Sequence, residues 1–317
     1  IVVRKSEHCD YWKCEHFSID KLDNNTVWDN AFEGIEAVIH LAGLAHSKNF
    51  TEKNYQSVNV KGTKHLANQA ANAGVKRFIF VSSIGVNGSN THGKPFSPDD
   101  LPCADNDYSC SKLEAEQSLK EIAEKTGLEL VIVRPTLVYG KDAPGNFGAL
   151  TNLIGKFSIL PFGLADNRRS FVAAQNLVDL LVTCANHPNA AGHTFLASDS
   201  ETVSIKEFTN AIGEGLGRNV IQLPVPVGMM RLVGKLTGKS AMIEQLYGDL
   251  EVDSRNIKEV LGWTALFAEK VHAAIPIATA PKHSAQNIAF HEIGRQAIMA
   301  DPEWCGGRYM DEKRYPA

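Results

Sequence analysis

Long hydrophobic runs, paired cysteines and surplus basic charge are all missing from this sequence. No apolar run reaches the roughly 18 residues of a membrane span, and the first residues lack the basic, apolar and small-residue order of a signal peptide. The six cysteines form no CxxC pair and no histidine-supported spacing, which indicates neither a metal site nor a disulfide framework. We therefore expect a cytoplasmic protein with no membrane span and no bound metal.

The net charge of the chain indicates which class of partner it binds. The chain has 32 basic and 36 acidic residues in 317, a formal net charge of −4. This balance lacks the basic surplus that usually accompanies nucleic-acid binding. We expect a small-molecule partner and no nucleic acid.

The chain alternates short apolar runs with segments of helical period. Apolar runs at 36–41, 77–81 and 128–133 predict strands, and the segments 59–73 and 108–126 between them predict helices. Continuously apolar strands separated by helices are typical of a parallel sheet covered on both faces. The sequence therefore predicts an α/β fold with a doubly wound, Rossmann-like sheet. Ile1-Val2-Val3, with no initiator methionine, reads as a strand already under way, so we expect the first strand to be absent.

The pattern loosens after residue 145, with helices expected at 176–186 and 205–215 and a strand at 194–196. We assign residues 1–145 and 165–190 to the dinucleotide-binding domain, and 146–164 and 191–264 to a smaller substrate lobe. Residues 265–317 differ in character, with a strand expected at 271–280 and a helix at 284–300, ended by Asp301-Pro302. This organisation predicts two packed lobes and a separate tail.

Tyr108 and Lys112 form a YxxxK pair, which the helical period puts on one face of the helix. A lysine ammonium beside a tyrosine favours the phenolate and should lower its pKa from about 10. On its own the pattern is common by chance and better fits a surface tyrosine beside a solvated lysine. Ser83 shifts the balance, because it follows the strand 77–81, and ligands of open parallel sheets gather at the carboxyl ends of strands. We expect Ser83 to hydrogen-bond a substrate hydroxyl or carbonyl, although strand-end serines are often only turn formers.

An ordered series of motifs surrounds this pair: HLAG at 40–43, NVKGT at 59–63, FVSS at 80–83, YSCSK at 108–112, RPTLVYG at 134–140, NRRSFV at 167–172 and LGW at 261–263. Over residues 1–264 the chain resembles the extended short-chain dehydrogenases/reductases, the family of NAD-dependent nucleotide-sugar epimerases and dehydratases. The resemblance implies Ser83, Tyr108 and Lys112 as the catalytic group. It also implies a homodimer formed through the helices 59–73 and 108–126.

The same resemblance places further residues around the ligands. Those at the NAD or NADP cofactor are Arg4, Asp20, Leu41, Ala42, Gly43, Asn59, Lys112, Pro135 and Val138. Asp20 would pair with the adenine amine, and Arg4 stands where an arginine accepts the 2′-phosphate of NADP. Arg168 or Arg169 would hold the diphosphate of the sugar nucleotide beside Ser83, because a guanidinium fork matches phosphate oxygens.

Two departures from the family bear on activity. The GxxGxxG loop that seats the cofactor pyrophosphate on a helix N-terminus would precede Ile1 and is absent. Ile84-Gly85 follows Ser83 where dehydratases carry an acidic pair, which disfavours dehydration. We expect a 4-epimerase of a UDP-hexose that transiently oxidises C4 and returns the hydride. The alternatives are an NADPH-dependent 4-keto-sugar reductase and an inactive, truncated relic.

The tail resembles another family. HSAQNIAFHEIGRQAIMADP at 283–302 is similar to homoserine O-acetyltransferases, over about residues 268–317. No GxSxG nucleophile elbow occurs in the chain, so we expect no acyl transfer. The two fragments meet at 264–267 without a visible linker, and we interpret them as a rearranged gene. A locus that sequences as one continuous reading frame would count against that interpretation.

Overall fold

The centre of the fold is a five-stranded sheet in the order β12–β3–β4–β5–β9. The structure is a computed structural model that describes residues 2–4, 16–45, 49–140, 146–199, 201–265 and 299–300. Four strands run parallel, and β12 is antiparallel to β3. The predicted parallel α/β sheet is confirmed. Their bounds are β3 Ala37–His40, β4 Arg77–Val81, β5 Glu129–Pro135, β9 Thr194–Ala197 and β12 Met299–Ala300.

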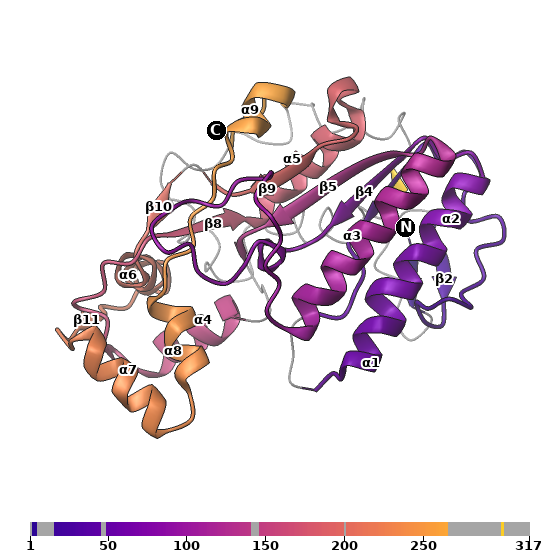
Figure 1. The fold of residues 1–317 in the computed structure, drawn as a ribbon. Helices are drawn as coiled ribbons and strands as arrows, with labels where there is room; N and C mark the ends of the chain where they lie inside the picture. The colour runs from indigo at the N-terminus through magenta and orange to yellow at the C-terminus, as the bar shows by residue number, and fades with distance from the viewer. Residues whose placement is uncertain are drawn as a thin grey trace.

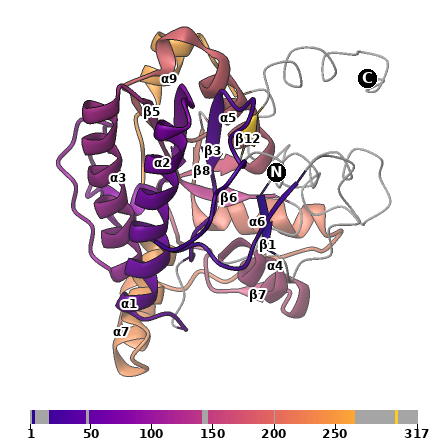
Figure 2. The ribbon, with the colours of Figure 1, turned by 90° about the vertical axis from the view of Figure 1, so that its right-hand side faces the viewer.

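Helices cover both faces of this sheet, as Figures 1 and 2 show. On one face lie α1 (Glu52–Tyr55), the π-helical turn η2 (Gln56–Gly62), α2 (Thr63–Asn72) and α3 (Asp107–Thr126). On the other lies α5 (Ala174–Asn186). Alternate residues of each strand point to opposite faces of the sheet. Val38 and Phe78 pack with α2 and α3. Ile39, Ile79 and Val131 pack with α5. Burial on both faces explains the continuously apolar strands.

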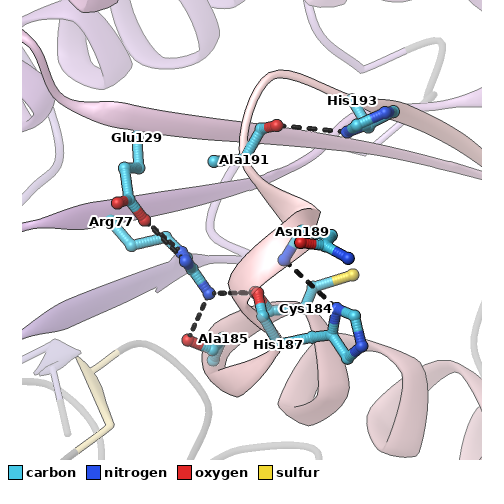
Figure 3. A network of polar contacts seen from close by, with 8 residues as sticks. All are labelled: Arg77, Glu129, Cys184, Ala185, His187, Asn189, Ala191 and His193. Atoms are coloured by element: carbon cyan, nitrogen blue, oxygen red, sulfur yellow. Dashed lines mark hydrogen bonds and ion pairs between the residues drawn. The ribbon is translucent and has the colours of Figure 1, made fainter. Parts of the chain in front are cut away.

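The amino end of β4 is clamped to the end of α5 by Arg77 (Figure 3). Its Nε and Nη2 donate to Glu129 Oε2 over 2.8 and 2.6 Å. Its Nη1 donates to the backbone carbonyls of Cys184, Ala185 and His187 over 3.1, 2.9 and 2.9 Å. These carbonyls lie at or just beyond the last turn of α5, where helical carbonyls have no partner within the helix. A single side chain thus joins two strands to one helix.

A second lobe packs beside the sheet at the lower left of Figure 1. Its aromatic core includes Phe171 and Phe208, whose rings stack with centroids 4.0 Å apart. Its strands are β6 (Leu137–Tyr139), β7 (Ile159–Leu160), β8 (Arg169–Ala173), β10 (Thr202–Val203) and β11 (Ile221–Gln222). Its helices are α4 (Asn146–Lys156), α6 (Ile205–Gly215), α7 (Val227–Leu236) and α8 (Ser240–Tyr247).

Three short helical elements complete the fold: η3 (Ile84–Val86), η4 (Pro188–Ala190) and α9 (Arg255–Leu261). Strand β9 joins the parallel sheet through β5, although residues 194–197 fall within the stretch that the sequence assigns to the lobe. The predicted helices at 59–73, 108–126, 176–186 and 205–215 are present, the first as the end of a helical segment that begins at Glu52. No helix among the described residues is long and apolar enough to cross a membrane.

The two ends of the chain contribute short strands. Strand β1 (Val2–Arg4) pairs in parallel with β2 (Phe17–Ile19), and Ile19 packs into the core beneath α2. The strand predicted at 271–280 and most of the helix predicted at 284–300 lie outside the described residues. Met299–Ala300, the end of that predicted helix, forms strand β12, so the prediction is wrong there. The edge of β3 offers backbone groups that a strand can pair with and a helix cannot.

Candidate active site

The site lies where strands β3, β4 and β5 end. Their register places the last residues of the three strands at one edge, with His40 beside Phe80 and Val81 beside Val133. Beyond this edge the N–H of Ser82 donates to the carbonyl of Val133 over 2.8 Å. The loops that follow β3 and β4 therefore start side by side, as the rule for open parallel sheets requires of a ligand site.

Helix α3 brings Tyr108 and Lys112 to this edge. Asn106 caps the helix, its Oδ1 accepting from the N–H of Ser109 over 3.0 Å. The Nζ of Lys112 donates to the carbonyl of Val81 over 2.9 Å and lies 4.7 Å from the centre of the Phe80 ring. Burial lowers the pKa of Lys112 to about 8, and the negative charge of Glu116 opposes that shift.

A buried ion pair fixes α3 against the sheet. Arg134, on β5, donates through Nε and Nη2 to the two carboxylate oxygens of Glu116, over 2.9 and 2.6 Å. Its third contact, from Nη1, is the Oδ1 of Asn87 at 2.9 Å. Both charged side chains are almost fully buried, and the bidentate geometry fixes direction as well as distance. Glu116 lies one turn after Lys112, so this ion pair sets the position of helix α3 and of Lys112 on it.

Ser83 and Tyr108 meet across the edge. A hydrogen bond with Ser83 lowers the pKa of Tyr108, but burial acts in the opposite direction and is the larger effect, so the pKa stands above 10.0. The ammonium of Lys112 does not lower the pKa of Tyr108, so the expected lowering by the lysine is wrong. The reason is geometric, because the ammonium of Lys112 is directed to Val81.

Gly85 leaves room for the two serines at the site. The Ser83 hydroxyl accepts the N–H of Gly85 over 3.2 Å. A Cβ on Gly85 would stand 2.5 Å from Ser109 Oγ and 3.4 Å from Ser83 Oγ. The glycine is therefore required by close approach rather than by backbone conformation.

Asn59 ties the loop after β3 to the catalytic helix. Its Oδ1 accepts the N–H of Leu44 over 2.7 Å, while its Nδ2 donates to the Leu44 carbonyl and to Ser111 Oγ over 3.1 and 3.0 Å. Gly43 lies beside this amide, and a Cβ there would come within 3.0 Å of Asn59 Oδ1 and 3.5 Å of Lys112 Nζ. Gly43 therefore lies between Asn59 and Lys112, and the half-buried Leu41 and Ala42 precede it in the loop after β3.

Sequence reasoning missed two residues that support this site. Tyr55 is buried, donates to the carbonyl of Ala45 over 3.2 Å and packs its ring edge-on against Tyr108, with centroids 6.1 Å apart. His40 is fully buried between the rings of Phe78 and Phe80, and its Nε2 meets Thr63 Oγ1 at 2.9 Å. Burial and the charge of Lys112 lower the pKa of His40 to about 3, so the imidazole is neutral. The position of His40 in the HLAG motif was the available signal.

The other predicted cofactor residues lie farther along the sheet. Pro135 ends β5 at the same edge as Ser82, and Val138 follows on β6, half-buried against the core beneath α5. Asp20 directly follows β2 and is exposed, and Arg4 ends β1 beside Ile19. The side chain of Arg4 lies outside the described residues.

The two predicted phosphate arginines differ in access. Arg169 is buried and donates through Nη1 to the carbonyl of Gly248 over 2.8 Å, and burial lowers its pKa to about 10. Arg168 is exposed, and its Nε donates to Glu251 Oε2 over 2.8 Å. Arg168 is therefore the one able to reach a ligand. Residues 251–253 also pair with the loop that follows Ser83, through the bridge between Phe96 and Val252.

These residues fit half of a nicotinamide dinucleotide. Gly43 leaves space beside Lys112 that a Cβ would fill. An ammonium has three donors, and Val81 takes one, which leaves Lys112 able to hold ribose hydroxyls. Asn59 borders the same space, and the Ser83–Tyr108 hydrogen bond lies at the same edge of the sheet. A doubly wound parallel sheet with serine, tyrosine and lysine at its carboxyl edge is the arrangement of a short-chain dehydrogenase/reductase type of enzyme.

Comparison with known proteins places the chain in one family. The NAD dependent epimerase/dehydratase family matches residues 2–197, and the chain belongs to it. A UDP-glucose 4-epimerase of Vibrio cholerae is 43% identical over 253 residues, covering 78% of this chain and 77% of that protein. An N-acetyl-α-D-glucosaminyl-diphospho-ditrans,octacis-undecaprenol 4-epimerase of Escherichia coli O157:H7 is 28% identical, covering 78% and 74%. The chain is by descent an enzyme of this family, whose cofactor is a nicotinamide dinucleotide.

Solved structures share the fold. The UDP-glucose 4-epimerase of Thermotoga maritima, solved with UDP-glucose, has a TM-score of 0.68 at 19% identity and covers 88% of this chain and 89% of its own. The UDP-glucuronic acid 4-epimerase of Bacillus cereus, solved with NAD, has a TM-score of 0.65 at 16% identity, covering 88% and 81%. The C-terminal segment matches homoserine O-acetyltransferases, among them one of Mesorhizobium japonicum at 55% identity over 58 residues, 18% of this chain and 15% of that protein. Both predicted resemblances are confirmed.

Proposed function

We propose that this protein is a UDP-hexose 4-epimerase. The observation that carries the proposal is the hydrogen bond between Ser83 and Tyr108 at the carboxyl edge of the sheet, where Lys112 binds the carbonyl of Val81. Asn59 holds the loop after β3 beside them. The 43% identity to a UDP-glucose 4-epimerase supports the choice of substrate class. Ile84-Gly85 follows Ser83 in a short helical turn, so this turn carries no acid for the elimination of water.

The chain's own groups act on the C4 position. Tyr108 removes the proton of the C4 hydroxyl and returns one to the same oxygen, and Ser83 holds that oxygen by a hydrogen bond. The bound nicotinamide supplies a hydride acceptor and donor. Lys112 holds ribose hydroxyls with the donors that Val81 leaves free. Arg168 meets the diphosphate, exchanging part of its contact with Glu251 for a phosphate oxygen.

The high pKa of Tyr108 defines its resting state. Tyr108 is a neutral phenol in the free protein, and it becomes a base only when positive charge enters the site beside it. In the reverse direction Tyr108 acts as the acid that protonates a 4-keto oxygen. The neutral phenol can do this without added positive charge beside it. A one-way 4-keto reductase would use only that second role, so the two activities differ in net cofactor consumption.

The test incubates purified protein with UDP-glucose and NAD⁺, and follows UDP-galactose by ion-pair chromatography. We expect interconversion without net formation of NADH, and a loss of about 10³-fold or more in Tyr108→Phe, since proton transfer contributes about 10²–10⁴. Tyr247→Phe is the matched control, because it removes a hydroxyl that donates to the carbonyl of Pro161 in the second lobe, and it should leave the rate unchanged. Consumption of NADPH with a 4-keto sugar, but no epimerisation, would favour the reductase. A protein that binds neither cofactor nor UDP-sugar would overturn the proposal.

A further inference from the structure

Helix α7 carries an apolar stripe that faces solvent. Met229, Leu232, Val233 and Leu236 follow the i, i+3, i+4, i+7 spacing of one helix face, and they are 51, 56, 46 and 78% exposed. A different face of α7 packs against the core of the lobe. Val227 and Met230 pack there, and Gly234 allows Ile243 of α8 to approach closely. The exposed stripe is therefore a second apolar face with no partner among the described residues.

More apolar side chains gather at the same end of the lobe. Strands β7 and β11 pair through Ile159 and Ile221, both more than half exposed. The described part of the chain has 14 exposed large hydrophobic side chains, and ten of them lie within residues 153–160 and 218–247. The four not yet named are Leu153, Phe157, Leu223 and Met242. Figure 1 shows α7, α8 and β11 together at the end of the lobe away from the sheet.

Positive charge surrounds these apolar residues. The segments 153–160 and 218–247 contain five basic residues and one acidic residue, Glu244, although acidic residues outnumber basic ones in the whole chain. The basic residues are all exposed: Lys156, Arg218, Arg231, Lys235 and Lys239. Arg231 pairs with Glu244, while Lys235 follows one turn later, so the basic face of α7 borders its exposed apolar stripe.

We propose that this end of the lobe, α7 and α8 with the β7–β11 ribbon, docks onto an anionic lipid bilayer. A helix with an exposed apolar stripe beside lysine and arginine lies in the plane of a membrane interface, with the stripe among the acyl chains and the cations at the headgroups. Each lysine near such a surface adds to the attraction, and its long stem reaches the headgroups while the apolar stripe is submerged.

A second copy of the chain fits this surface less well. A two-fold contact brings the same patch against itself, and each copy would then oppose an excess of four positive charges to an equal excess. The helices predicted to form a dimer, α2 and α3, carry none of the exposed large hydrophobic side chains of the described residues. An anionic bilayer would bury the apolar stripe among its acyl chains and attract the positive charge to its headgroups.

The docking is independent of the proposed epimerase activity and is tested without it. Purified protein is floated with vesicles of phosphatidylcholine alone and of phosphatidylcholine with a quarter phosphatidylglycerol, at low and high salt. We expect recovery with the anionic vesicles, reduced by salt because charge contributes. Leu232→Gln/Leu236→Gln should weaken the partitioning about tenfold or more, as should Lys235→Gln/Lys239→Gln.

Matched control variants make the same substitutions at exposed residues outside this face. Val27→Gln/Leu101→Gln changes two apolar side chains that are 64 and 89% exposed elsewhere, and should leave the partitioning unchanged. Lys120→Gln/Lys125→Gln removes two exposed positive charges from α3 and should also leave the partitioning unchanged. Failure to float with anionic vesicles, or equal losses in test and control variants, overturns the proposal. So does light scattering that shows Leu232→Gln/Leu236→Gln to reduce the oligomeric state, because the face would then bind a second copy.

Discussion

The Nζ of Lys112 donates to the carbonyl oxygen of Val81, the last residue of β4, over 2.9 Å. This bond ties the catalytic helix to the strand end that leads into Ser82 and Ser83. The amine also faces the Phe80 ring at 4.7 Å and is buried. The site therefore holds a lysine in fixed geometry, but at the free-energy cost of taking an ammonium out of water.

This cost predicts a stability that depends on pH through Lys112. The folded pKa of about 8 lies below the ordinary 10.5, so the folded state releases the proton first. Stability from this group therefore rises as pH increases between about 8 and 10.5. Relative to Lys112→Met, the wild-type free energy of unfolding should gain roughly 2 kcal/mol between pH 7 and 9.5. Urea denaturation at both pH values measures it. The exposed Lys120→Met should show no such change, and an equal gain there would refute the assignment.

A second prediction concerns the ionisation of Tyr108. Burial raises its pKa above 10.0, and the hydrogen bond with Ser83 restrains that rise. The tyrosinate absorbance of the wild type minus that of Tyr108→Phe should therefore develop only above pH 10. In the Ser83→Ala background the same difference should move to higher pH. A shift to lower pH, or a titration below pH 9 in the free protein, would contradict the structure.

Gly85 provides a steric test. Gly85→Ala places a methyl group 2.5 Å from Ser109 Oγ, so we expect a loss of about 1–3 kcal/mol in stability and a fall in turnover as Ser83 is displaced. Adding Ser109→Ala removes the obstructing oxygen and should recover most of both. Gly155→Ala is the control, because nothing lies within 4 Å of its Cβ and alanine favours a helix. Thermal melts and steady-state kinetics measure the series. Lack of recovery in the double variant would show that the contact is not the cause.

Arg77 should matter for stability and not for chemistry. Arg77→Met removes the donor to Glu129 and to the carbonyls of Cys184 and Ala185, and one of the two donors to the carbonyl of His187, so we expect a loss of about 3 kcal/mol. Lys76→Met removes the exposed contact with Glu36, 3.5 Å long, and should cost less than about 1 kcal/mol. Chemical denaturation gives both values. Turnover per folded molecule should stay at the wild-type value in each, and a lowered turnover in Arg77→Met would contradict this division.

The sequence predicted the sheet because continuously apolar runs such as 77–81 have few alternatives to a buried parallel strand. Strand ends and helical spacing also predicted Ser83, Tyr108 and Lys112 as one catalytic group. The structure joins Ser83 to Tyr108 by a hydrogen bond and Lys112 to Val81, and the catalytic role of the three stays a prediction. The ionisation of Tyr108 could not be predicted in this way. It depends on where the ammonium of Lys112 points, and the acceptor, the carbonyl of Val81, is a backbone atom that no residue type encodes.

Other features depended on contacts between distant segments. Asn59 meets Ser111 across 52 positions of sequence, and Tyr55 reaches Tyr108 through a π-helical stretch that hydrophobic periodicity does not reveal. The strand at Met299–Ala300 arose from the free edge of β3 and not from its own helical pattern. The predicted dimer, the role of Arg4 and the adenine contact of Asp20 stay predictions.

Strand β4 is only five residues long, yet its first residue holds the Arg77 clamp and its last accepts the bond from Lys112. The contact at the first residue uses the Arg77 side chain, so a single substitution can remove it. The contact at the last residue uses the backbone carbonyl of Val81, which any residue at position 81 would supply. The two ends of this strand therefore differ in how far substitution can alter them.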